Sequence, residues 1–594
     1  MAGLGVTAAT PEVDATPVGG DGDGIPPPDL ARSFFAWGAA SYLVITLVIV
    51  AFSVARAGGE LVYVIDDPAI HLSVAENLVH HGTWGVAPGH FESASSSPLW
   101  TLLLSAWIAV VPGPDEIAPL ALNVIAGLAV IAVVAAGQRI LWPGLRRPVE
   151  AMAVAALVNV VLFLPGLAMT GMEHSLHIAL ALAGLALLHR AVLGRPRLGP
   201  GWLPYALVGL ATLTRFETAF LAAGIAVALY LLQPGAGPAG RAGWVSWSRV
   251  RWPLLVVASA ALPLAGFALF NRAMGQGWLP NSVSAKSAVT RTASTAATFE
   301  GALNRFSTDP LVAGLTAVMA VALIVAARRA ASWSFPAVVL VVTVALHMLL
   351  ARVGWYERYQ AYLIAVGVYA LVCLIGEQLP ATSLPPARSL AVAGLVAVML
   401  TLSGNKPAAT FRAAEAVGET YDQRYQAALF LSRYYQGEPI ATGELGYISL
   451  FHDGPITDVF GLGDYEVLQA WGGSAGPPVD GERSAADGRP PAEFWEDLAE
   501  RRGFAVVAVY PLTLLGVVPE SWIPVGRWDL GRLISTAPGP EFEFYATTPE
   551  AVGPLRDHLI EFSDELPDRV ETELNELAGL RADELAQAGS AGDG

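Results

Sequence analysis

Long apolar runs separated by short polar segments dominate the chain up to Leu402. Most of these runs approach the length that a helix needs to cross a bilayer, which is about 20 apolar residues. The run at 98–112 is shorter and is expected to be half-embedded or strongly tilted. The pattern predicts further membrane-embedded helices within 34–55, 117–138, 150–168, 174–193, 203–214, 216–233, 252–270, 311–327, 333–351, 359–377 and 387–402.

After Leu402 the sequence becomes mixed polar, with short β-like runs such as Phe504–Val509 and helical stretches such as Ala413–Tyr435. Its acidic periodic stretch 554–588 predicts a surface helix or a pair of helices. We therefore expect a soluble α/β domain over 404–594, with a flexible C-terminal end.

The chain preceding this domain divides into two parts. Residues 1–33 are rich in Gly, Pro and Asp and have no basic stretch before the first apolar run. This composition predicts a disordered cytoplasmic tail and no signal peptide. Residues 34–403 are expected to form a multi-pass α-helical transmembrane domain, whose first external loop is 56–97.

Composition agrees with a membrane protein. Of the 594 residues, 54% are hydrophobic and only 14% are charged, against about 25% charged in soluble domains. The formal net charge of −17 argues against nucleic acid as a partner. Cys373 is the only cysteine, which excludes disulfides and cysteine-based metal sites.

Basic residues cluster in alternating loops, which predicts the orientation of the chain because cytoplasmic loops carry an excess of arginine and lysine. The scheme gives about eleven net crossings, with the N-terminus inside and the C-terminal domain outside a bacterial plasma membrane. The clusters are Arg146 and Arg147, Arg195 and Arg197, Arg241, Arg249 and Arg251, and Arg328 and Arg329.

Most of the unusual polar residues fall in the predicted external segments. A charge at the end of a span is costly unless it is paired or hydrated, although a single arginine there can reach the interface with its long stem. Acids and bases gathered on one membrane face instead predict an external polar cavity. Its candidate residues are Asp66, Asp67, Glu92, Glu173, Arg215, Glu217, Lys286, Glu357 and Arg358.

Two adjacent acids, Asp66 and Asp67, stand in the first external loop. Asp67 precedes Pro68 and suits a helix cap, which slightly favours Asp66 as a chemical base and leaves both open. His71 follows about one helical turn later, so that the three side chains can share a face. They are candidates for a divalent-cation site, with a solvated loop histidine as the plain alternative.

The ordered motifs resemble those of the GT-C integral-membrane glycosyltransferases. The resemblance covers residues 34–465 and departs from the family pattern at Phe216, where proline is usual. Its narrower likeness is to the mycobacterial terminal β-arabinofuranosyltransferases. The motifs are Asp66-Asp67-Pro68, Thr170-Gly171-Met172-Glu173, Thr214-Arg215-Phe216-Glu217, Leu279-Pro280-Asn281 leading to Lys286, Glu357-Arg358-Tyr359 and Asp458-Val459-Phe460-Gly461-Leu462.

The resemblance implies an inverting transfer of a sugar, with arabinofuranose as one candidate, from a polyprenyl-phosphate donor to a glycan or lipid acceptor. It assigns the general base to the double-Asp loop. Lys286, Arg215 and Arg358 would stabilise the leaving phosphate. Glu92 and Glu173 are candidates for substrate binding, with a surface carboxylate and an arginine partner as their respective alternatives.

A transporter or flippase of envelope lipids or sugars is the alternative function. Such a protein is expected to carry its charges near mid-membrane, together with inverted repeats and broken helices. Here the charges crowd one face, and no repeat is visible. A cavity closed towards the cytoplasm favours an enzyme, whereas a through-passage favours transport.

Overall fold

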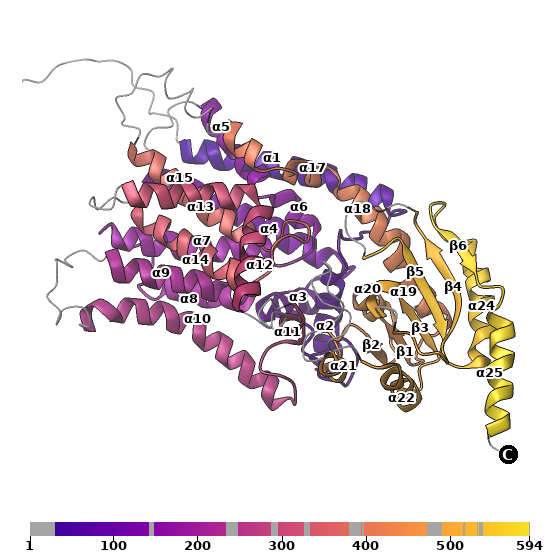
Figure 1. Ribbon diagram of the computed structural model, residues 1–594. Helices are drawn as coiled ribbons and strands as arrows, with labels where there is room; N and C mark the ends of the chain where they lie inside the picture. Colours follow the sequence, from indigo (N-terminus) through magenta and orange to yellow (C-terminus); the bar gives the residue numbers. More distant parts are fainter. Residues whose placement is uncertain are drawn as a thin grey trace, which may run out of the picture.

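The computed structural model describes most of the chain. The predicted tail over 1–33 lies outside the described residues except for its last four. Figure 1 shows an elongated molecule, with a bundle of helices at one end and a sheet flanked by helices at the other. The described residues are 30–141, 148–232, 247–286, 295–325, 333–378, 394, 397–471, 490–514, 517–531, 533 and 538–592.

The helical part buries apolar side chains from nearly all of its long helices in one continuous core. α1 runs along one side of the bundle, and its contacts with α4 and α5 close that side (Figure 1). The helices are α1 Leu30–Arg56, α2 Asp67–His81, α3 Pro98–Val110, α4 Ile117–Leu141, α5 Pro148–Val161, α6 Leu164–Met169, α7 His174–Val192, α8 Leu203–Thr214, α9 Thr218–Leu232, α10 Trp247–Ala273, α11 Asn281–Lys286, α12 Thr295–Thr308, α13 Pro310–Val325, α14 Ser334–Leu350 and α15 Ala361–Gln378.

Within the described ranges, four helices are long and apolar enough to cross a membrane. The count becomes five if 299–308 and 310–325, which meet at a bend of 104°, form one span. The prediction of about eleven crossings is therefore not confirmed. Several predicted spans are apolar helices of 10–17 residues, and at about 1.5 Å of rise per residue most of them are shorter than the hydrocarbon core. The shorter helices are Pro98–Val110, Leu203–Thr214, Thr218–Leu232, Ser334–Leu350 and Ala361–Leu374.

The C-terminal part contains one six-stranded mixed sheet, which confirms the prediction of an α/β domain. The strand order is β2-β1-β3-β5-β4-β6. β1 pairs in parallel with β2 and β3, and the remaining pairs are antiparallel. The strands are β1 Ile440–Thr442, β2 Ile456–Asp458, β3 Val506–Val509, β4 Ile523–Asp529, β5 Glu541–Ala546 and β6 Glu571–Leu574.

Helices cover both faces of this sheet. Successive side chains of a strand point to opposite faces, so neighbouring residues pack against different helices. Val506 and Ala508 pack with the helices on one face, whereas Val507 and Val509 pack with those on the other. α19 and α24 lie on the first face, and α21 and α22 lie on the second. The helices are α17 Lys406–Phe411, α18 Ala413–Thr420, η3 Tyr421–Tyr425 (a π-helix), α19 Gln426–Tyr434, α20 Leu445–Phe451, α21 Tyr465–Ala470, α22 Ala492–Arg502, α23 Pro511–Leu514, α24 Pro549–Ser563 and α25 Ala578–Gly592.

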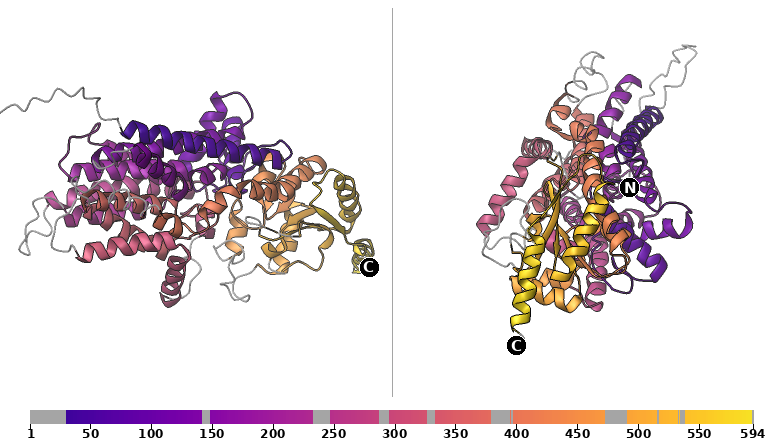
Figure 2. Two further views of the ribbon diagram at one scale, coloured as in Figure 1. Left: turned by 90° about the horizontal axis from the view of Figure 1, so that it is seen from above. Right: turned by 90° about the vertical axis from the view of Figure 1, so that its right-hand side faces the viewer.

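The two parts meet where the parallel strands of the sheet end. α20 follows β1 and packs against α2 of the helical part. The segment after β2 approaches the loop between α2 and α3, where a Cβ on Gly463 would come within 3.4 Å of Val86. Figure 1 labels α2, α11, α20 and α21 at this junction, and Figure 2 shows the two parts of the molecule from two further sides. In open α/β sheets ligands bind beyond the carboxyl ends of parallel strands, and this end faces the first loop.

Candidate active site

The two adjacent acids are placed by the start of α2. Pro68 stands in its first turn, where a missing N–H costs no helical hydrogen bond. Asp66 occupies the N-cap position without making a side-chain cap bond, and Asp67 is the first helical residue. The expectation that Asp67 occupies the N-cap position of this helix is therefore wrong, and the two carboxyl groups point to different partners.

Asp66 faces the C-terminal part. Its carboxylate accepts hydrogen bonds from the backbone amides of Gly446 (2.6 Å) and Tyr447 (3.0 Å) at the start of α20. A Cβ at position 446 would come within 2.3 Å of Asp66, so only glycine allows this approach. Asp66 thus joins the loop between α1 and α2 to the segment after β1.

A second buried acid lies beside this contact. Glu444 accepts a hydrogen bond from Arg424 Nε at 2.6 Å. Burial raises the pKa of Glu444 to about 8, although Arg424 opposes the shift. Burial also raises the pKa of Asp66, again opposed by Arg424 and by the two backbone amides. Glu444 and Arg424 were not predicted from the sequence, because neither stands in a recognisable motif.

Asp67 turns towards the helical part, where Arg358 Nη2 lies 2.5 Å from Asp67 Oδ2. The Asp67 side chain is 20% exposed, whereas that of Arg358 is 2% exposed. Arg358 also donates to the Tyr359 hydroxyl at 3.1 Å. Its Nε and Nη1 are buried and have no hydrogen-bond partner among the described residues. A buried guanidinium with unpaired N–H groups is a candidate site for an anion.

The backbone before Arg358 is unusual. Trp355, Tyr356 and Glu357 have φ values of 48°, 61° and 61°, a left-handed conformation that is costly for residues other than glycine. Contacts made by the turn hold it. The Tyr356 hydroxyl donates to the Ala409 carbonyl at 2.9 Å, and Glu357 lies 2.9 Å from Lys406 Nζ. This turn therefore places Arg358 by means of residues at the start of the C-terminal part.

Lys406 holds a second acid besides Glu357. Its Nζ lies 2.9 Å from Asp309 Oδ2, and both side chains are almost fully buried. The remaining oxygen of Asp309 accepts from the amides of Leu311 and Val312 at the start of α13. The sequence analysis assigned no role to Lys406, although it is one of only two lysines in the chain.

Glu173, Arg215 and Glu217 form a second charged group. Arg215 Nη1 lies 2.6 Å from Glu173 Oε1, and Nη2 lies 2.5 Å from Glu217 Oε1. The alternative role of Glu173, pairing with an arginine, is therefore observed. Its Oε2 is buried without a hydrogen-bond partner in the described part of the chain. The Arg215 guanidinium also lies over the Tyr359 ring, 5.4 Å from its centroid, which links the two charged groups.

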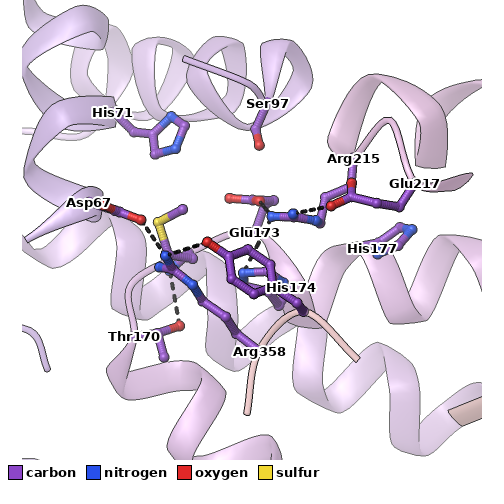
Figure 3. Close-up of polar contacts among 12 residues, drawn as sticks. Asp67, His71, Ser97, Thr170, Glu173, His174, His177, Arg215, Glu217 and Arg358 are labelled. Carbon is purple, nitrogen blue, oxygen red and sulfur yellow. Dashed lines mark hydrogen bonds and ion pairs between the residues drawn. The ribbon is translucent and has the colours of Figure 1, made fainter. Parts of the chain in front are cut away.

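Histidines surround this group. His71 Nδ1 lies 3.1 Å from Ser95 Oγ, and His174 Nε2 lies 3.5 Å from Arg215 Nη1. Figure 3 shows His71, Ser97, Glu173 and Arg215 around the region that Asp67 and Arg358 also face. His174 was missed in the sequence analysis, although it directly follows Glu173.

The predicted metal set is not assembled. Asp66 faces α20, Asp67 pairs with Arg358, and His71 contacts Ser95. Among the residues that the structure describes, no group of three or more His, Cys, Asp or Glu side chains has an arrangement that could hold a metal ion. A divalent-cation site on these three residues therefore stays a prediction from the sequence.

The contacts of Glu92 lie apart from the charged groups. Glu92 Oε2 accepts from the Val86 amide at 3.2 Å and faces the segment after β2. Burial raises its pKa to about 8, with Asp464 and Asp458 adding to the shift. Lys286 ends α11, and its side chain lies outside the described part of the structure.

Comparisons with known proteins found one family match and several structural similarities at low sequence identity. Residues 412–545 match the family described as "Domain of unknown function (DUF8728)". No curated protein matches the chain. ArnT from Cupriavidus metallidurans, solved with undecaprenyl phosphate, is similar in structure with a TM-score of 0.49 and 15% identity over 86% of this chain and 98% of that chain.

Two structures of the Archaeoglobus fulgidus oligosaccharyltransferase are also similar. The apo form has a TM-score of 0.45 and 14% identity over 83% of this chain and 73% of that chain. AglB in complex with an inhibitory peptide and a dolichol-phosphate has a TM-score of 0.44 and 13% identity over 86% and 74%. These TM-scores lie below 0.5, and the function of this chain is therefore argued from its own residues.

Proposed function

We propose that this chain is an integral-membrane glycosyltransferase of the GT-C type. It transfers a sugar from a polyprenyl-phosphate donor to a glycan or lipid on the external face of a bacterial plasma membrane. The observation that carries the proposal is Arg358, which is buried beside the partly exposed Asp67 and keeps two nitrogens without a partner in the described part. One region thus offers a cation for a phosphate and a carboxylate for a proton.

Asp67 is the proposed general base. Both oxygens of Asp66 accept backbone amides, whereas Asp67 is the more exposed acid. The acceptor hydroxyl attacks the anomeric carbon from the face opposite the phosphate, and its proton passes to Asp67. The bond between the anomeric carbon and the phosphate oxygen breaks, and the electron pair leaves with the polyprenyl phosphate. One displacement of this kind inverts the anomeric configuration.

The charges of the site define what else the donor needs. Asp67, Glu173 and Glu217 are three carboxyl groups, whereas Arg215 and Arg358 are two guanidinium groups, which leaves one negative charge if all are ionised. A phosphate group adds to this negative charge. The proposal therefore gives Lys286 the role of a further cation at the phosphate.

The remaining predicted residues have binding roles in this proposal. The unpartnered Oε2 of Glu173 accepts a sugar hydroxyl, and His71 lies on the same region (Figure 3). Glu92 orders the loop that borders the acceptor side through its bond to Val86. Arabinofuranose is the sugar to test first, because the narrower sequence resemblance names it.

A transfer assay tests the proposal. The full chain in nanodiscs is given polyprenyl-phosphoryl arabinose, mannose, glucose and galactose, each with a glycan acceptor. We expect transfer from at least one donor, with Asp67→Asn lowering kcat by about 100-fold, as for other general bases. Absence of transfer from all donors by the wild type, or full activity of Asp67→Asn, would overturn it.

A further inference from the structure

An uncharged polar cluster lies beside the charged site, where the loop after α2 meets the end of α10 and the start of α11. We call Ser93, Asn271, Gln276, Asn281 and Ser282 the amide cluster. Ser93 Oγ donates to Asn271 Oδ1 at 3.0 Å, and the Asn281 amide donates to the Ser93 carbonyl at 3.0 Å. Asn281 Nδ2 donates to Gln276 Oε1 at 3.4 Å. Polar contacts thus join the loop after α2 to the segment from Asn271 to Ser282, which lies far from it in sequence.

Part of this cluster lacks partners. Asn271 Nδ2, Asn281 Oδ1 and Ser282 Oγ are buried, and none has a hydrogen-bond partner among the described residues. The exposed fractions of these residues are 0%, 0% and 5%. Folded proteins leave few buried polar atoms unpaired, so such a group calls for a ligand or water. The three atoms are a donor, an acceptor and a hydroxyl that can do both, which matches the hydroxyl groups of a sugar.

Aromatic rings adjoin the amide cluster. Trp84 contacts Phe267 and Phe270, with ring centroids 6.0 Å and 6.5 Å apart. Phe91 lies 5.3 Å from Phe270, which directly precedes Asn271. Binding sites for neutral ligands combine apolar and aromatic walls with a few placed polar groups, and a sugar ring offers C–H faces to such a wall. Trp278, in the segment between α10 and α11, is 60% exposed.

The same rings connect the amide cluster with the charged site. Phe216, next to Arg215, lies 5.9 Å from Phe267, which in turn contacts Trp84. On the other side, a Cβ on Gly277 would lie 3.4 Å from Tyr465 of the C-terminal part. The cluster therefore lies between the charged site and the α/β domain, near α11 and α21 in Figure 1.

We infer that the amide cluster is a binding subsite for the uncharged, hydroxyl-rich ring of a sugar substrate. The inference rests on the proposed function and adds the residues that recognise the sugar. The charged site instead holds Asp67, Glu173 and Glu217 as ion pairs with two arginines. The sugar belongs to the donor or to the acceptor, and kinetics separate these two sources.

Ser282→Ala is the main test, because it separates binding from stability. The hydroxyl has no described protein partner, so its removal breaks no known bond and should leave the melting temperature equal or higher. We expect the KM of one substrate to rise about 5-fold with kcat nearly unchanged, the signature of lost ground-state binding. A rise in the donor KM assigns the ring to the donor, and a rise in the acceptor KM assigns it to the acceptor.

Asn281→Leu provides a stronger variant, and Asn159→Leu is its matched control. Asn159 is fully buried and donates to the Gly38 carbonyl and to Ser41 Oγ within the helix bundle. Its replacement should lower the melting temperature and leave both KM values unchanged. Unchanged KM values in Ser282→Ala and folded Asn281→Leu, or an equal change in Asn159→Leu, would overturn the inference.

A binding measurement keeps this test separate from the proposed function. Saturation-transfer difference NMR on the wild type in nanodiscs uses methyl arabinofuranoside and methyl glucopyranoside as probes. We expect a signal from at least one glycoside that is lost in Asn281→Leu and kept in Asn159→Leu. No signal from the wild type, or the same signal from all three proteins, would contradict the subsite even if transfer is observed.

Discussion

Asp66 and Asp67 are neighbours in the sequence and belong to different environments in the structure. Asp66 is held by two backbone amides of α20, next to the buried pair of Glu444 and Arg424. Asp67 pairs with the guanidinium of Arg358, which keeps unpartnered nitrogens within the described part. On the Asp66 side the polar groups satisfy one another, whereas the Asp67 side leaves groups for a substrate.

The difference shows that the reactivity of an acid depends on whether its partners leave hydrogen-bonding groups available for a substrate. A carboxylate whose two oxygens each accept a hydrogen bond from a backbone amide links two segments of chain and is held in place by them. A carboxylate beside a partly unpaired arginine lies in a region that is incomplete without a ligand. The comparison therefore separates a joining acid from a reacting acid, although both have the same side chain.

The largest expected effect comes from exchanging the two arginines for lysine. Arg358→Lys should lower kcat/KM for a polyprenyl-phosphoryl donor by about 100-fold, because lysine lacks the planar fork of donors. Arg424→Lys, the matched change on the Asp66 side, should lower activity less than about 10-fold and mainly reduce stability. Steady-state kinetics and melting temperatures of both variants test this prediction. Equal losses of activity would contradict the distinction between the Asp66 side and the Asp67 side.

A smaller effect is expected at the amides that hold Asp66. Gly446→Ala places a Cβ within 2.3 Å of Asp66 and should destabilise the protein by about 1 to 3 kcal/mol, as overpacking does. Gly553→Ala is the control, since a Cβ there meets nothing within 4 Å. Thermal unfolding followed by tryptophan fluorescence measures both. If Gly446→Ala and Gly553→Ala had equal melting temperatures, the contact of Asp66 with α20 would contribute little to stability.

The last expected effect appears only as the pH changes and concerns Glu92, a third acid of the same loop, which also faces the C-terminal part. Its pKa is raised from 4.5 to about 8, mainly by burial. The folded state therefore holds this proton more tightly than the unfolded state, and the resulting stability is lost as pH rises from 4.5 through 8. Glu92→Gln should lose less stability over this range. If the melting temperatures of wild type and Glu92→Gln changed by the same amount between pH 5 and 8, the raised pKa of Glu92 would be contradicted.

Much of this organisation follows from sequence patterns. Hydropathy predicts the helical part, and the change after Leu402 predicts the α/β domain that the structure contains. Charges at the ends of apolar runs predict that Asp67, Glu173, Arg215 and Arg358 come near one another. This succeeds because charges that cannot enter a bilayer must find partners or water.

Other features were not accessible from sequence. The partners of Asp66 are backbone amides about 380 positions away, and every non-proline residue has such a group, so that no side-chain signal marks them. The number of spans is not fixed by such runs, because apolar runs predict burial equally well for short helices packed inside a bundle. The amide cluster was missed because single Asn and Ser residues in loops are common.

The left-handed turn at Trp355, Tyr356 and Glu357 has a consequence for how the molecule can evolve. Glycine adopts this conformation without strain, so glycine at any of the three positions should relieve backbone energy. At Tyr356 and Glu357 it would also remove the side chains that reach Ala409 and Lys406 and so fix the residue that follows the turn, Arg358. Selection for relief of backbone strain at these two positions would therefore loosen the arginine, and backbone strain and turnover should trade against each other there.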